Sequence, residues 1–356
     1  MKKVNILETT LRDGSYAIDF SFTTADTRRI CKELESAGFE YIEIGHGIGL
    51  NASKSGYGKA IQTDTEYLEA ASNVLEKAKF GMFCIPGIAR LEDIDLAAKF
   101  NMKFIRIGTN ANEVEKSQRF IERAKKHGMF VAANYMKSYT ISPKEFAKQV
   151  KFSQEYGADM VYVVDSAGGM FEKDIEKYYY AIREISNISL GYHGHNNLSM
   201  GVANSLKAVE LGFDFVDSSL QGLGRSSGNA PTECLVAALI KLGYDLDLNL
   251  FKVLEIGQNL IKPMLNSKGL HPLDIVAGFA DFHSSFMKLI HKYAAKYSVN
   301  PAVLIIEISK VNKTNVEETE LDRIASQIKK EEDLFLANYN FSRYIGSEQQ
   351  KLNKNS

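Results

Sequence analysis

The chain of 356 residues has only three cysteines and no tryptophan. Cys31, Cys84 and Cys234 lie far apart, are odd in number and form no C-x-x-C motif. Such usage is typical of reduced thiols in a cytoplasmic protein and argues against a disulfide framework. Two lysines open the chain without an apolar stretch behind them, so we predict a cytoplasmic protein without a signal peptide.

Long hydrophobic runs and blocks of one charge are also missing. No stretch approaches the roughly 20 apolar residues that a membrane-spanning helix needs. The net charge is −1 and the lysines occur in short pairs, so we expect no general attraction to nucleic acid or to an anionic membrane. The chain does have 45% hydrophobic residues, which is enough for a large core.

Short apolar runs alternate with longer amphipathic stretches through the first two thirds of the chain. The runs typical of strands are 4–7, 41–45, 80–85, 103–108, 129–135, 160–165, 188–193 and 213–220. The stretches typical of helices follow them in turn, at 25–37, 64–78, 90–100, 112–127, 143–156, 171–185, 198–211 and 230–242. Eight such units, spaced for right-handed crossovers, predict a (β/α)₈ TIM barrel.

Several units share one local signature, as in "ESAGFEYIEIG" and "VELGFDFVDSS". A helix end is followed by a glycine suited to the left-handed C-cap conformation and then by an apolar strand. A doubly wound open sheet is the alternative fold, but the G-x-G-x-x-G loop usual in its dinucleotide-binding members is missing.

The pattern changes near residue 245. Helical stretches at 248–262, 282–297, 301–312 and 316–331 follow with few strands between them. We therefore predict a barrel domain (1–245), a helical C-terminal domain (246–345) and a polar tail (346–356).

Two of the seven histidines stand one residue apart in "GYHGHNNLSMG". Side chains alternate across a strand, so His193 and His195 point the same way. In such barrels the active site lies where the strands end, and Asp13 follows the first strand in "TTLRDGSYAID". One carboxylate and two imidazoles can hold a divalent ion with open positions for substrate oxygens. Alternatively, both histidines only hydrogen-bond within the barrel.

Other candidate residues follow other strands. Arg12 suits a developing enolate oxyanion, or else forms a salt bridge inside the barrel. The loop "GLGRSSGNAP" supplies backbone donors to an anion and Asn229 as a further metal ligand, or only allows a tight turn. His46, in a glycine- and serine-rich loop after the second strand, is a candidate substrate-binding residue.

These motifs together resemble a known family. "ETTLRDGSYAI", "IEIGHGIGL", "VDSAGGM", "YHGHNNLSMGVANS" and "GLGRSSGNAP" are similar to the DRE-TIM metallolyase superfamily, and most similar to its 4-hydroxy-2-oxovalerate (4-hydroxy-2-oxoacid) aldolases. The resemblance runs in order from about residue 5 to 300.

The resemblance implies a reaction and a site. Mn²⁺ or Mg²⁺ would be held by Asp13, His193 and His195. Arg12 would neutralise a metal-bound pyruvate enolate, and Ser166 would contact the substrate's carboxylate or carbonyl region. The implied reaction is retro-aldol cleavage of a 4-hydroxy-2-oxoacid to pyruvate and an aldehyde, or the reverse condensation.

One pair of residues departs from the family pattern. Where the family has a histidine base after the RDGS motif, this chain has Tyr16, and where it has a late tyrosine, this chain has His283. Histidine titrates near neutrality, whereas tyrosine has a pKa of about 10. We therefore predict that His283 is the base and that Tyr16 orients it or donates to a substrate oxygen. A histidine on the surface of a C-terminal helix is the alternative for His283.

Other functions are weighed against this one. The main alternative is a Claisen-type synthase that joins an acyl-CoA to a 2-oxoacid, as isopropylmalate and homocitrate synthases do, but "GLGRSSGNAP" lacks the acidic residue of their loop. A hydroxymethylglutaryl-CoA lyase needs a cysteine loop that has no counterpart here. A barrel that only binds or scaffolds is the non-enzymatic alternative. The resemblance also implies a homodimer and an acylating aldehyde dehydrogenase as partner.

Overall fold

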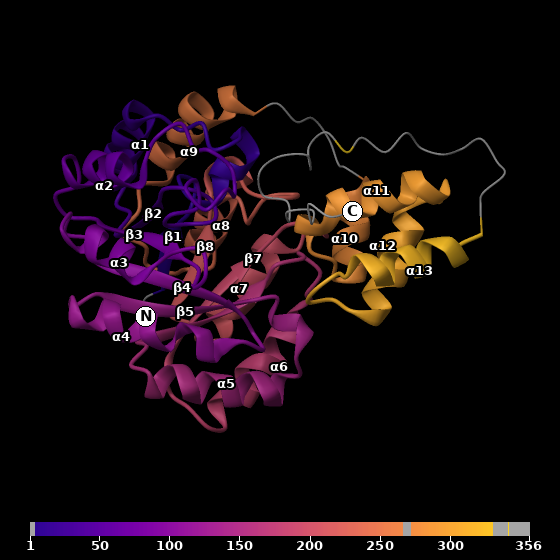
Figure 1. Ribbon diagram of the computed structural model, residues 1–356. Coiled ribbons are helices and arrows are strands. Elements are labelled where there is room, and N and C mark those ends of the chain that lie inside the picture. The colour runs from indigo at the N-terminus through magenta and orange to yellow at the C-terminus, as the bar shows by residue number, and fades with distance from the viewer. Residues whose placement is uncertain (1–3, 266–271, 330–340, 342–356) are drawn as a thin grey trace.

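A computed structural model describes residues 4–265, 272–329 and 341. Its parallel strands pair in chain order, and β1 pairs with β8 over Asn5–Glu8 and Phe215–Ser218, which closes the barrel (Figure 1). The predicted (β/α)₈ barrel is therefore confirmed. The strands are β1 (Asn5–Glu8), β2 (Tyr41–Ile44), β3 (Lys79–Cys84), β4 (Phe104–Asn110), β5 (Phe130–Met136), β6 (Met160–Asp165), β7 (Ser189–Gly194) and β8 (Phe215–Ser218).

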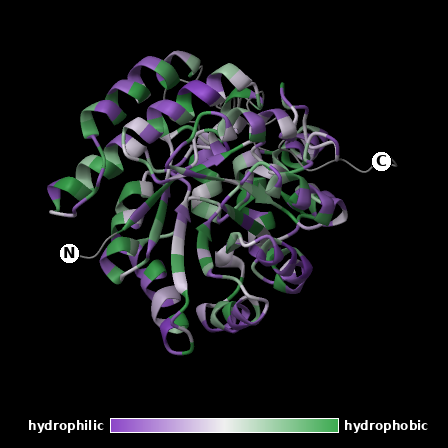
Figure 2. Ribbon diagram, turned by 90° about the vertical axis from the view of Figure 1, so that its left-hand side faces the viewer, coloured by the Kyte–Doolittle hydropathy of each residue, from purple (hydrophilic) through white to green (hydrophobic). Residues whose placement is uncertain are grey.

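A helix follows each strand and packs on the outside of the barrel. These helices are α1 (Thr24–Ser36), α2 (Asp64–Ser72), α3 (Leu91–Ala98), α4 (Gln118–Lys126), α5 (Pro143–Glu155), α6 (Glu172–Arg183), α7 (Gly201–Leu211) and α8 (Thr232–Lys241). Hydrophilic and hydrophobic positions alternate along them, as expected of amphipathic helices (Figure 2). The glycines predicted to cap helices do have positive φ, for example +101° at Gly38 and +100° at Gly212.

The second helix is shorter than its periodicity predicts. The pattern extends to residue 78, but α2 ends at Ser72. Beyond it, the backbone N–H groups of residues 76, 77 and 78 all donate to the Glu35 carboxylate, at 2.9, 2.7 and 2.7 Å. A side chain from α1 therefore takes the backbone hydrogen bonds that a longer helix would need, a tertiary contact that periodicity cannot reveal.

Two hydrophobic layers hold the barrel together. The larger layer lies between the sheet and the outer helices and includes Ile42, Ile105 and Leu190. The smaller one fills the barrel's interior with side chains that include Leu7, Phe104 and Met160. Because the interior is packed, chemistry is confined to the barrel mouth, where the strands end.

Five further helices follow the barrel within the described residues, and most of them form a separate hydrophobic cluster. They are α9 (Leu250–Ile256), α10 (Pro272–Ala280), α11 (Met287–Tyr297), α12 (Pro301–Val311) and α13 (Glu318–Gln327). The buried side chains of α9 belong to the barrel's core, whereas α10 to α13 share their own cluster from Leu273 onward. The sequence pattern did not predict α10. The domain limits stay a prediction, and the tail 346–356 lies outside the described residues.

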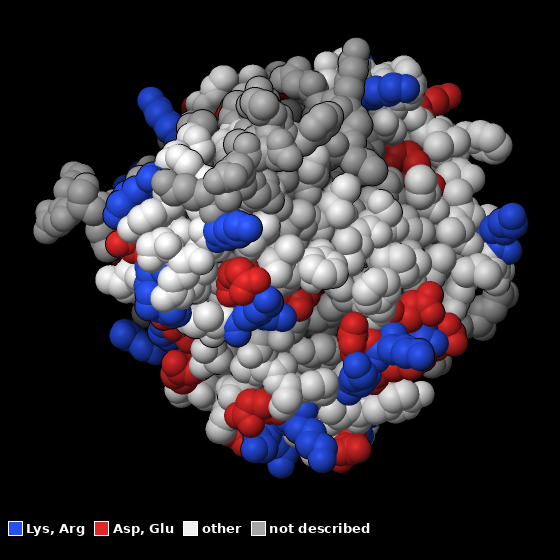
Figure 3. Space-filling model, turned by 90° about the vertical axis from the view of Figure 1, so that its right-hand side faces the viewer, with Lys and Arg blue, Asp and Glu red and all other residues white. Residues whose placement is uncertain are grey.

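The described residues include no helix that is long and apolar enough to cross a membrane. On the face that carries the C-terminal helices, basic and acidic side chains are interspersed (Figure 3). The mixture of both charge signs on that face is consistent with the net charge of −1.

Candidate metal centre and active-site cavity

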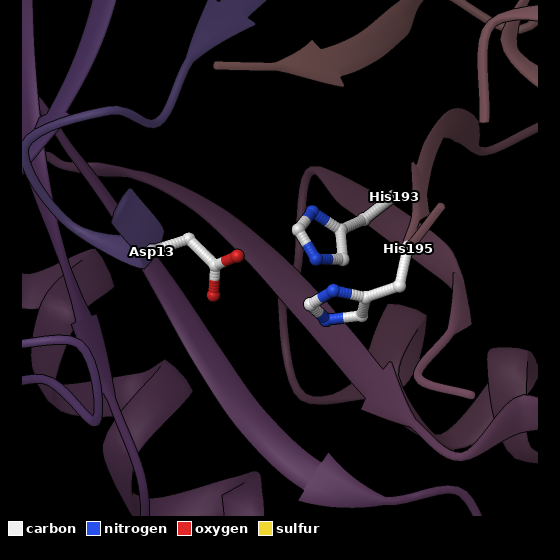
Figure 4. A group of neighbouring side chains, drawn as sticks. All are labelled: Asp13, His193 and His195. Atoms are coloured by element: carbon white, nitrogen blue, oxygen red, sulfur yellow. The ribbon is translucent and has the colours of Figure 1, made fainter. Parts of the chain in front are cut away.

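Three side chains, one from near the start of the chain and two from its seventh strand–helix unit, meet at the barrel mouth. Asp13 follows β1 on a short 3₁₀ helix, His193 lies in β7, and His195 follows that strand. One ligand atom from each residue lies within 4.8 Å of the others, and all three residues are buried. Figure 4 shows the carboxylate facing the two imidazoles. This set of one oxygen and two nitrogen donors is typical of a divalent-metal site with open positions.

The hydrogen bonds of the histidines leave the correct nitrogen available. His193 donates from Nδ1 to the Asp217 carboxylate at 2.8 Å, and His195 donates from Nδ1 to the Gly228 carbonyl at 3.2 Å. In the neutral form of each ring, Nε2 is therefore the nitrogen that can bind a metal. Burial lowers the pKa of His195 to about 3, so this ring is neutral at physiological pH. The residues present therefore fit a divalent ion.

Asp13 is held as a carboxylate. Arg12 Nη1 donates to its Oδ1 at 2.6 Å, and Asn229 Nδ2 donates to its Oδ2 at 2.7 Å. Burial raises the pKa of Asp13, but Arg12 and the two histidines outweigh burial and hold the pKa well below its usual range. Asn229 Oδ1 is buried and has no hydrogen-bond partner within the described residues, so this oxygen could add a fourth ligand.

A buried chain of ion pairs connects the arginine beside the metal site to one of its histidines. Glu43 accepts from Arg12 Nε at 2.6 Å and from Arg106 Nε at 2.7 Å. Arg106 Nη1 donates to Asp217 at 2.5 Å, and Asp217 in turn accepts from His193. Alternating charges keep the buried set close to neutral and fix the geometry of each member.

A cavity of about 320 Å³ opens beside these residues. Its lining includes Arg12, Tyr16, Ser166 and His283 as well as both histidines of the metal site. The structure therefore brings most of the predicted site residues together, including the exchanged tyrosine and histidine. Gly47 leaves room for the Tyr16 ring, because a Cβ at Gly47 would lie only 2.8 Å from that ring.

His283 is half-buried and lines the cavity, just before a short 3₁₀ helix (Ser284–Phe286), rather than lying on the outer surface of a helix. Arg225 Nη1 lies 3.1 Å from its Nδ1. A guanidinium only donates, so Nδ1 accepts and Nε2 carries the proton. Burial, followed by the charges of Arg225 and Lys137, holds the pKa of His283 well below its usual value. The ring is therefore neutral at physiological pH.

His46 takes a different place from that predicted. Its Nδ1 accepts from the Ile48 N–H at 3.1 Å, its Nε2 lies 3.2 Å from the Gly58 carbonyl, and its ring stacks on Phe20. Burial lowers its pKa to about 4. Both ring nitrogens are used to organise the loop after β2, and His46 is not among the residues that line the cavity.

Four site residues were not singled out for these roles from the sequence. Glu43 and Asp217 are charges inside apolar strand runs, which is a usable signal for a buried ion pair. Lys137 and Arg225 follow β5 and β8, and both line the cavity. The rule that chemistry lies where barrel strands end would have included them.

Gly224 allows a test of the metal site's packing. A Cβ there would meet Asn229 Nδ2 at 2.6 Å and Asp13 Oδ2 at 2.9 Å. We expect Gly224→Ala to weaken Mn²⁺ binding by about 10- to 100-fold, the range typical for disturbed metal supports. Calorimetric titration with Mn²⁺ measures the effect. In the control Gly14→Ala, the three atoms nearest to the Cβ would all belong to the side chain of Leu223, at 3.0 to 3.4 Å. Equal Mn²⁺ affinity in the two variants would contradict the prediction.

Comparisons with known proteins agree with this geometry. The HMGL-like family model matches residues 3–260. A 4-hydroxy-2-oxovalerate aldolase of Carboxydothermus hydrogenoformans is 34% identical over 92% of this chain and 98% of its own. One from Pelotomaculum thermopropionicum is 37% identical over 86% of this chain and 91% of its own. The carboxyl transferase domain of Rhizobium etli pyruvate carboxylase, solved with pyruvate and biocytin, shares the fold with a TM-score of 0.74. It is 16% identical and matches over 91% of this chain and 60% of its own.

Proposed function

This chain belongs to the HMGL-like family, and we propose that it is a divalent-metal-dependent aldolase that cleaves or forms a 4-hydroxy-2-oxoacid. The observation that carries the proposal is the convergence of Asp13, His193 and His195 beside a cavity lined by Arg12. Relatives that match nearly the whole chain carry an aldolase name. The Claisen-type synthase is therefore not favoured.

The roles of the residues follow from their contacts. A divalent ion, Mn²⁺ or Mg²⁺, would be held by Asp13 and the two histidines, with Asn229 as a further ligand, and would polarise the substrate's 2-oxo group. Within the described residues, Arg12 Nη2 makes no hydrogen bond, so this group is available to the oxygen on which negative charge develops. The Ser166 hydroxyl accepts from the Lys137 N–H at 2.9 Å and can still donate to the substrate's carboxylate.

Cleavage requires a base for the proton of the 4-hydroxyl group. As that proton leaves, the C3–C4 bond breaks to give the aldehyde, and its electrons form the pyruvate enolate, which is then protonated at C3. His283 is neutral, and its Nδ1 lies 3.1 Å from Arg225 Nη1, 2.7 Å from Ser285 Oγ and 3.3 Å from the Ser285 backbone nitrogen. It can take the proton at Nδ1 once Arg225 and the Ser285 hydroxyl turn to other partners. Tyr16 shares the cavity and would position the hydroxyl group.

Substitution of the exchanged pair tests these roles. We expect His283→Ala to lower the kcat for cleavage by about 10²- to 10⁴-fold, the usual contribution of a general base. Tyr16→Phe should cost less, about tenfold, because it removes a hydrogen bond and leaves the base in place. Turnover at saturating metal is the measurement, and His291→Ala, an exposed position in α11, is the matched control. Near-wild-type turnover in both variants would contradict the exchanged pair.

Direct assay tests the reaction itself. With Mn²⁺, purified protein should release pyruvate from 4-hydroxy-2-oxovalerate, measured by coupling to lactate dehydrogenase. Release should stop when a chelator removes the metal. Acetyl-CoA should have no effect. Failure to release pyruvate, combined with acetyl-CoA-dependent consumption of a 2-oxoacid, would instead support the synthase.

Several further features stay predictions. We propose a cytoplasmic location, as the cysteine usage indicates, and a homodimer; we also propose an acylating aldehyde dehydrogenase as partner, as the resemblance implies. Size-exclusion chromatography with light scattering tests the dimer, and co-purification tests the dehydrogenase.

A further inference from the structure

The charges that line the cavity are of one sign. Three cationic side chains, Arg12, Lys137 and Arg225, reach its wall, and all three residues are buried. No aspartate or glutamate is among the described residues that line it. A buried charge is costly unless an opposite charge or strong hydrogen bonds compensate it.

Two of the three cations lack such compensation. Arg12 is paired with Glu43 and Asp13. Within the described residues, the Lys137 ammonium, by contrast, donates only to the Thr314 carbonyl, at 2.7 Å, and lies 5.1 Å from the centre of the Phe286 ring. Burial, together with the charge of Arg225, lowers the pKa of Lys137 to about 8.

Arg225 is likewise without a carboxylate. It contacts His283, Ser284 and the Ser166 carbonyl, none of which is negatively charged. Across the part of the chain that the structure describes, neither Arg225 nor Lys137 forms an ion pair. Within the described residues, the cavity therefore holds two positive charges without an ion-pair partner, and Glu113 acts on Lys137 only from beyond ion-pair distance.

The two cations contact different parts of the cavity wall. Arg225 Nη1 lies 3.1 Å from His283 Nδ1, and the Arg225 guanidinium lies 5.9 Å from the centre of the Tyr16 ring. Lys137 instead contacts Thr314, in the segment between α12 and α13, and Phe286, just before α11. Arg225 is therefore beside the residues that we assign to the 4-hydroxyl group, and Lys137 lies where the C-terminal part of the chain covers the cavity.

We propose that the aldehyde that this protein uses carries an anionic group, a carboxylate or a phosphate, which Lys137 binds with the help of Arg225. This inference rests on the proposed aldolase function. The anionic group is unchanged in the reaction, in which only the bond between pyruvate C3 and the aldehyde carbon forms or breaks. By attracting Arg225, it would also remove one of the donors that contact His283 Nδ1.

Paired aldehydes test the proposal in the condensation direction with pyruvate and Mn²⁺. Succinic semialdehyde is compared with butyraldehyde, and glyceraldehyde 3-phosphate with glyceraldehyde. A hydrogen bond to a charged group favours an anionic substrate by about 10- to 100-fold in kcat/KM. We expect such a preference in at least one pair, and the pair that shows it identifies the group as a carboxylate or a phosphate.

Variants assign the preference to Lys137. Lys137→Met should remove most of it, by lowering kcat/KM for the anionic aldehyde far more than for the neutral one, and Lys137→Arg should restore part of it. Lys148→Met, an exposed lysine on α5, is the matched control and should keep the wild-type preference. An equal loss for both aldehydes in Lys137→Met would overturn the proposal, because it would indicate a structural role.

Failure of this inference is distinguishable from failure of the proposed function. If wild-type protein exchanges the methyl protons of pyruvate but shows no preference in either pair, the anionic aldehyde is excluded and the aldolase stands. If exchange and cleavage are both absent, the proposed function fails and the inference fails with it.

Discussion

Replacement of His193 by alanine is expected to lower metal-dependent pyruvate release by about a thousandfold. A metal that polarises a carbonyl supplies several kcal/mol of transition-state stabilisation, and each 1.36 kcal/mol is a factor of ten in rate. The substitution removes one metal ligand and also breaks the hydrogen bond between His193 and Asp217. Of its two ion pairs, Asp217 would then keep only the one with Arg106. Both Mn²⁺ affinity and kcat should therefore fall.

The control for this variant is His127→Ala. His127 lies at the end of α4, where its Nε2 contacts Asp95 at 2.7 Å, and its side chain is one-third exposed. We expect wild-type Mn²⁺ affinity and turnover in that variant. If His193→Ala kept either Mn²⁺ affinity or turnover near the wild-type level, the candidate metal centre would be wrong.

Replacement of Arg12 by lysine should lower kcat by about 10²- to 10³-fold, the usual cost of losing an oxyanion donor. Lysine keeps the charge but cannot reproduce the planar fork by which Arg12 contacts Glu43 through Nε and Asp13 through Nη1. Since the metal ligands remain, Mn²⁺ affinity should change much less than kcat.

Measurement of both quantities separates the two roles of Arg12. Arg90→Lys serves as the control, because Arg90 is an exposed arginine paired with Asp93 at the start of α3. A variant Arg12→Lys with wild-type kcat would show that Arg12 is only a structural ion-pair partner, which is the alternative that the sequence left open.

Local patterns were sufficient to predict most of the fold. Strand runs, helix periodicity and left-handed glycines such as Gly38 are properties of short segments, and each is reproduced in the structure within a few residues. The early end of α2 was not predictable in this way, since the Glu35 side chain that takes over its backbone N–H groups lies about 40 residues away. The helix α10 has one charged residue, Asp274, among nine mostly apolar residues and a glycine in its interior, so its sequence lacks an amphipathic pattern.

The candidate site likewise contains residues that the sequence could predict and residues that it could not. Asp13, His193 and His195 were predictable because the barrel places the ends of its strands together. The burial of Lys137 was not, because its partner Thr314 is 177 residues further along, in the segment between α12 and α13. In the sequence, "YMKSYT" looks like an ordinary loop, and only the covering helices turn its lysine into a buried cation. His46 shows the converse, since a promising loop position is used for backbone hydrogen bonds.

Exchange of the methyl protons of pyruvate in D₂O, followed by NMR, tests the central claim most directly. It requires only pyruvate, the protein and Mn²⁺, so it does not depend on the identity of the aldehyde. The account predicts exchange with wild-type protein, none after metal removal, and at most trace exchange with His193→Ala. Wild-type protein that binds Mn²⁺ but leaves the methyl protons in place would contradict the account, because the site would then not form the pyruvate enolate.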